Sequence, residues 1–176
     1  LLILLFFQFG VVHNWLQAIV GLIIVLVISF LFTTVAARAI AIVGTNPVSG
    51  MTLMTLILSS FILVKVGMTG TSGMISALLI GGVVCTALSM AGGFVTDLKI
   101  GYWLGTTPVN QEKYKFLGTL VAAGSVGFVI MILNETYGFV GPEALVAPQA
   151  NAMAAVIKPL MSNMPAPWLL YAVGAI

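Results

Sequence analysis

The stretch that decides the fold is GMISALLIGGVVCTALSMAGGFVTDLK, residues 73–99. It carries no charge before Asp97. A helix needs about 20 mostly apolar residues to cross the hydrocarbon core of a bilayer, so residues 73–96 predict a membrane-spanning helix. Every fourth residue is small: Gly73, Ala77, Gly81, Cys85, Ser89 and Gly93. Because small residues at this spacing let another helix approach closely, the stripe predicts a helix–helix contact.

The rest of the chain is equally apolar. Of its 176 residues, 61% are hydrophobic and 6% are charged, whereas soluble domains are about 25% charged. This composition excludes a soluble enzyme, a nucleic-acid-binding protein and a secreted disulfide scaffold. One cysteine and one histidine are too few for an internal disulfide or a metal cluster, so we expect no cofactor. The chain is predicted to be an integral membrane protein whose first partner is the lipid bilayer.

Charged residues and helix breakers divide the chain into apolar segments. The expected full spans are residues 15–43, 49–66, 73–96 and 116–133, with a partial span at 168–176. Residues 148–158 are too few to span and predict a re-entrant or interfacial helix. The predicted fold class is an all-α, polytopic transmembrane helical bundle that forms a single region over residues 1–176. Because the apolar ends are too short to span, we expect a fragment of a longer protein; the alternative is a small complete subunit.

The lysines predict the orientation of these spans. A polar loop is expected at 97–115, and it contains Lys99, Lys113 and Lys115. Since cytoplasmic loops carry an excess of Lys and Arg, this loop is predicted to be cytoplasmic and the connection over 134–167 to lie outside.

Asp97 is the first candidate for chemistry. It is expected to close the helix over 73–96, where the negative end of the helix dipole disfavours a carboxylate. One interpretation is structural: Asp97 caps a short helix, or pairs with Lys99 or Lys113. The other is that Asp97 is an ionisable group at the mouth of a pathway and takes up a proton.

Two further places combine a helix break with polar side chains. Asn46 and Pro47 either begin the next span as its N-cap and first residue, or form with Ser49 a broken-helix site for an anionic ligand. Gln149 and Asn151 are the polar members of the short helix over 148–158, which either lies flat outside the membrane or faces a cavity. These five residues are the candidates for a substrate pathway.

Three blocks of the sequence resemble the oligopeptide transporter family. They are GTNPVSGMT at 44–52, GFVTDLKIGY at 93–102, and LVAPQA at 145–150, which continues into MAAVIK at 153–158. The resemblance covers essentially the whole chain and implies a longer protein with many spans. Members of the peptide branch carry Lys-Ile-Pro-Pro-Arg where this chain has GTTPV at 105–109. This departure favours the prokaryotic, yellow stripe-like side of the family.

The resemblance implies a secondary transporter of the cell membrane, driven by proton symport. Its substrates would be small peptides or metal ions chelated by amino-carboxylates. A second copy of the chain, in a homo-oligomer, is a further candidate partner. Asp97, Lys99 and Tyr102 of the second block are the candidates for proton coupling or gating. The alternative is a non-transporting membrane subunit of a bioenergetic complex, although a proton-pumping subunit should place Glu or Lys well inside its helices. An enzyme is not expected, since no nucleophile–base pair is visible.

Overall fold

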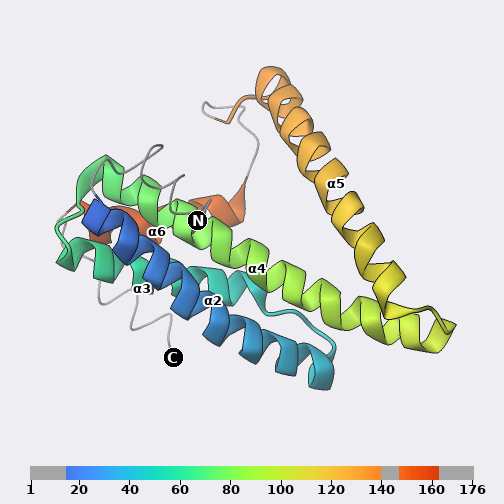
Figure 1. The fold of residues 1–176 in the computed structure, drawn as a ribbon. Coiled ribbons are helices and arrows are strands. Elements are labelled where there is room, and N and C mark those ends of the chain that lie inside the picture. The colour runs from blue at the N-terminus through green and yellow to red at the C-terminus, as the bar shows by residue number, and fades with distance from the viewer. Residues whose placement is uncertain (1–14, 140–146, 163–176) are drawn as a thin grey trace. The chain divides into compact units, whose positions relative to one another are not determined.

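The computed structural model describes residues 15–139 and 147–162, and the regular structure within them is helical (Figure 1). The helices are α2 (Trp15–Val43), α3 (Val48–Lys65), α4 (Gly70–Leu104), α5 (Pro108–Thr136) and α6 (Pro148–Met161). The first four are long and apolar enough to cross a membrane. The predicted all-α transmembrane class is therefore confirmed. The expected partial span at 168–176 lies outside the described residues.

Glycines set the ends of several helices. The φ angle is +78° at Gly44, +86° at Gly67 and +68° at Gly138, which end α2, α3 and α5. Residues with a side chain rarely adopt this left-handed conformation, so glycine stops a helix at little cost. The N–H of Gly44 donates to the carbonyl oxygen of Ile40 at 2.9 Å, which satisfies one of the free carbonyls at the end of α2.

The prediction of a loop over 97–115 is wrong, because most of these residues are helical. α4 continues to Leu104 and α5 begins at Pro108, so only residues 105–107 connect them. Asp97 consequently lies inside α4 and does not close it. The prediction failed because it treated charged residues as a helix end, although no proline occurs between Asp97 and Gly105 and the single glycine there, Gly101, does not stop the helix. Proline is well tolerated in the first turn of a helix, so Pro108 starts α5.

The described residues divide into two compact units. Within the described residues, the first unit comprises 15–93 with 149–162, and the second comprises 94–139 with 147–148. In the first unit, buried side chains of α2, α3, α4 and α6 form one apolar cluster. Ile157 and Met161 attach α6 to this cluster. Hydroxyl side chains are also buried there, and they mostly bond to their own helix; Thr55, for example, donates to the carbonyl oxygen of Met51 at 2.8 Å.

The small-residue stripe forms a close helix contact over its first part. Gly73, Ala77 and Gly81 are buried, and a Cβ atom at Gly81 would lie 2.5 Å from Cδ2 of Leu56 in α3. Further along, Cys85 is half-buried and Ser89 is exposed. The stripe leaves the contact because a step of four residues turns about 40° too far on a helix of 3.6 residues per turn. The buried face continues instead through Val84, Leu88 and Gly92.

Candidate functional site

The second unit contains a helical hairpin made by the end of α4 and by α5. Gly105 has a φ of +70°, and the N–H of Thr106 donates to the carbonyl oxygen of Gly101 at 2.9 Å. This pattern is the glycine-based ending known as the Schellman motif. Thr107 is the N-cap of α5, and Pro108 occupies its first turn. Three residues therefore turn the chain from one helix into the next.

Asp97 forms an ion pair across this hairpin. Its Oδ2 lies 2.9 Å from Nζ of Lys115 in α5. The Lys115 side chain is 16% exposed and that of Asp97 is 43% exposed. The ammonium group also lies 5.3 Å from the centre of the Phe94 ring, within the range of a cation–π contact. The positive charge thus faces a carboxylate and an aromatic ring that both belong to α4.

Gln111 reaches α4 one turn before Lys115. Its Nε2 donates to the main-chain carbonyl oxygen of Asp97 at 2.5 Å. Its Oε1 occupies the space that a Cβ atom would take at Gly101. Phe94, Asp97, Gly101, Gln111 and Lys115 are called the hairpin cluster below.

The predicted partners of Asp97 are corrected by this geometry. The sequence offers Lys99 or Lys113 as the partner of Asp97, whereas the structure pairs Asp97 with Lys115. Lys99 instead lies 5.6 Å from the centre of the Tyr102 ring and 5.4 Å from that of Trp103. Two residues along a helix correspond to a rotation of about 200°, so Lys99 points away from the face that carries Asp97. Tyr102 is 78% exposed.

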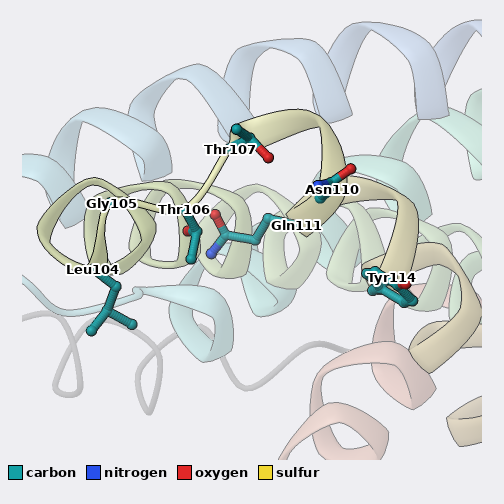
Figure 2. Close-up of a pocket in the computed structure, with 7 residues that line it drawn as sticks. All are labelled: Leu104, Gly105, Thr106, Thr107, Asn110, Gln111 and Tyr114. Carbon is teal, nitrogen blue, oxygen red and sulfur yellow. The ribbon is translucent and has the colours of Figure 1, made fainter.

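A hollow of about 520 Å³ opens beside the turn of the hairpin. Its lining residues are Leu104, Gly105, Thr106, Thr107, Asn110, Gln111 and Tyr114 (Figure 2). The side chains of Thr106 and Gln111 point toward one another in this view. The hollow offers hydroxyl and amide groups, and it adjoins the hairpin cluster through Gln111.

The break between α2 and α3 belongs to the first unit. Pro47 is the N-cap of α3 and makes no side-chain cap bond, so Asn46 precedes the N-cap and does not occupy it. The Asn46 amide lies against α4, where its Nδ2 fills the space of a Cβ atom at Gly92. The first of the three sequence blocks thus contacts the helix residue that immediately precedes the second block. Ser49 is exposed in the first turn of α3.

The candidates of the third block lie at the beginning of α6. Gln149 and Asn151 are both exposed, whereas Ile157 and Met161 near the other end of this helix are buried. That α6 is a re-entrant or interfacial helix stays a prediction. Across residues 15–139 and 147–162, no three His, Cys, Asp or Glu side chains gather in a way that could hold a metal ion.

Sequence reasoning missed Lys115, Gln111, Gly101 and Gly92. A helix start at Pro108 would have placed Gln111 and Lys115 one turn apart on one face of α5, because residues four apart are neighbours on a helix. Nothing in the sequence marks Gly92 or Gly101 among the 19 glycines of the chain. Their importance depends on which side chain approaches them.

Comparison with known proteins supplies the context of this site. The model of the family described as "OPT oligopeptide transporter protein" matches residues 1–176. A protein of Haemophilus influenzae named "Putative oligopeptide transporter" is 27% identical over 158 residues. That alignment covers 77% of this chain and 25% of the relative, so the chain spans about a quarter of the relative's length. No solved structure matches the chain.

Proposed function

The chain belongs to the OPT oligopeptide transporter family, and on that premise we propose that the protein is a secondary active transporter of a small solute. The family match over residues 1–176 carries the proposal. Four long apolar helices and the family make the chain part of a multi-pass integral membrane protein of the cell membrane.

Protons drive the transport, and Asp97 takes part in coupling or gating together with Lys99 and Tyr102. An ionisable side chain in an apolar helix is costly and usually functional. Asp97 also holds Lys115 of the next helix at 2.9 Å. A change in the charge of Asp97 would therefore change a contact between two helices, which is what a gate requires.

The substrate is a small peptide or a metal chelate of an amino-carboxylate. Both classes carry carboxylates and amines, which amide and hydroxyl groups can bind. Asn46, Pro47 and Ser49 at the start of α3, and Gln149 and Asn151 at the start of α6, are the candidates for this contact. The first turn of α3 contains no acidic residue, so its free N–H groups are suited to an anionic group.

Uptake by the full-length protein in liposomes tests this function. Labelled di- and tripeptides and metal chelates are offered separately, with and without an inward proton gradient. We expect the gradient to accelerate the uptake of one class, and a protonophore to abolish the acceleration. Uptake that equilibrates without accumulation under every gradient would contradict the symport mechanism. A protein that moves neither class would contradict the proposed substrates.

A further inference from the structure

The side-chain amide of Gln111, which belongs to α5, makes two contacts with α4. Neither contact is part of the backbone hydrogen bonding within α4. The carbonyl oxygen of Asp97 lies inside α4, where the N–H four residues later normally bonds to it. Gln111 nevertheless adds a second donor to this oxygen, at 2.5 Å and from a different helix. Within the part of the chain that the structure describes, the other atom of the amide, Oε1, is buried without a hydrogen-bond partner, and it occupies the Cβ space of Gly101.

We propose that Gln111 and Gly101 are positioning residues for the Asp97–Lys115 ion pair. The absence of a side chain at Gly101 lets the Gln111 amide sit directly on α4, and this fixes the first turns of α5. Lys115 follows one turn later on the same face of α5, and its Nζ then reaches Oδ2 of Asp97 at 2.9 Å. The inference rests on the proposed function, in which Asp97 takes part in coupling or gating.

The two connections across the hairpin respond differently to the charge of Asp97. Lys115 binds the carboxylate and loses this partner when Asp97 is neutral. Gln111 binds the main chain, and that hydrogen bond does not depend on the carboxylate. The ion pair can therefore break and form again while Gln111 keeps the two helices in register.

The other charged groups near the turn of the hairpin do not replace Lys115. Lys99 of α4 lies over the rings of Tyr102 and Trp103. Glu112 is half-buried on α5, and its Oε1 has no hydrogen-bond partner among the described residues. Lys113 of α5 is exposed. Each of these groups lies on the same two helices, but Lys115 is the cation that the structure places at Asp97.

A double-mutant experiment separates positioning from general packing. Gly101→Ala, Gln111→Ala and the double variant are compared by their gradient-driven uptake in liposomes, per amount of folded protein. A Cβ atom at Gly101 displaces the Gln111 amide, so each single change should reduce uptake roughly fivefold or more, the size expected for residues in direct contact. The double variant should be no worse than either single variant, and KM should stay unchanged in all three.

Gly118→Ala of α5 is the matched control, because nothing lies within 4 Å of a Cβ atom at that position. It should transport like wild type. Losses that multiply in the double variant would overturn the proposal, as would a Gly101→Ala variant that behaves like the control. A rise in KM without a change in maximal rate would assign these residues to substrate binding instead and would also overturn it.

Hydrogen exchange tests the positioning without any transport. Gln111→Glu keeps the length of the side chain but removes the donor. Both Gly101→Ala and Gln111→Glu should speed amide exchange in the peptide over 105–112 by the same factor, while Gly118→Ala leaves it unchanged. Unchanged exchange in both variants would overturn the proposal. If the wild type moved no substrate, the proposed function would fail while this measurement still decided the positioning.

Discussion

At the scale of single residues, Asp97 is the most informative side chain to change. Asp97→Asn removes the negative charge and keeps the size. A partly exposed ion pair contributes only about 0–1 kcal/mol to stability, so the variant should insert and fold normally. Its uptake should nevertheless lose most of its response to a proton gradient, because Lys115 no longer has a charged partner. The measurement is the initial uptake rate per folded protein, with and without the gradient.

Glu135→Gln is the control for this experiment, since Glu135 is an exposed carboxylate near the end of α5. It should transport like wild type. If Asp97→Asn kept full activity and an unchanged response to the gradient, Asp97 would have no part in the mechanism. Asn46 and Pro47 would then be the better candidates.

Gly92 is the second residue that can be tested by itself. A Cβ atom at Gly92 would overlap Nδ2 of Asn46 and lie 3.0 Å from Cδ1 of Ile40. Asn46 is exposed and can move, so Gly92→Ala should fold but displace a candidate substrate residue. We expect KM to rise roughly threefold or more, because contacting residues usually couple by 0.5–3 kcal/mol.

Gly82→Ala is the matched control in the same helix, because a Cβ atom there meets nothing within 4 Å. Steady-state uptake at increasing substrate concentration measures KM for both variants. Equal values for Gly92→Ala, Gly82→Ala and wild type would show that the position of Asn46 does not affect substrate binding.

At the scale of helices, the contact between α3 and α4 depends on Gly81. Leu56 is buried, and its Cδ2 lies 2.5 Å from the position of a Cβ atom at Gly81. Gly81→Leu must separate the two helices or move Leu56 out of a packed site. Such overpacking costs about 1–3 kcal/mol, so the folded yield and the melting temperature should both decrease.

The neighbouring Gly82→Leu adds the same side chain where a Cβ atom meets nothing. It should change stability by no more than about 0.5 kcal/mol. Size-exclusion chromatography after heating detects the difference between the two variants. If Gly81→Leu and Gly82→Leu were equally stable, the packing of α3 against α4 would not depend on the contact at Gly81.

At the scale of the whole molecule, the orientation of the spans is still a prediction. Lys99, Lys113 and Lys115 predict that the α4–α5 turn faces the cytoplasm, because cytoplasmic loops carry an excess of Lys and Arg. Single cysteines at Asn110 and Tyr137, in a Cys85→Ser background, lie near opposite ends of α5. An impermeant maleimide added outside the cell should label Tyr137→Cys and spare Asn110→Cys. If only Asn110→Cys were labelled, the spans would have the orientation opposite to the predicted one.

Local sequence determined the membrane class and the main helices of this protein. The expected span over 15–43 coincides with α2 (Trp15–Val43). Such agreement is understandable because insertion depends on the length and hydrophobicity of one segment, without reference to its neighbours. The ends of α4 and α5 were harder to predict, since a few charges do not stop a helix and only the glycine at 105 and the proline at 108 mark the turn.

The sequence could predict which single residues of the candidate site are important, but not which residues they contact. Asp97 and Asn46 stand out in the sequence because each is polar in an apolar context. Their contacts depend on how two helices are rotated against one another, and this rotation is set by packing between segments that lie apart in the chain. Only the tertiary structure could therefore assign Lys115 to Asp97, seat Gln111 on Gly101 and place Asn46 on Gly92.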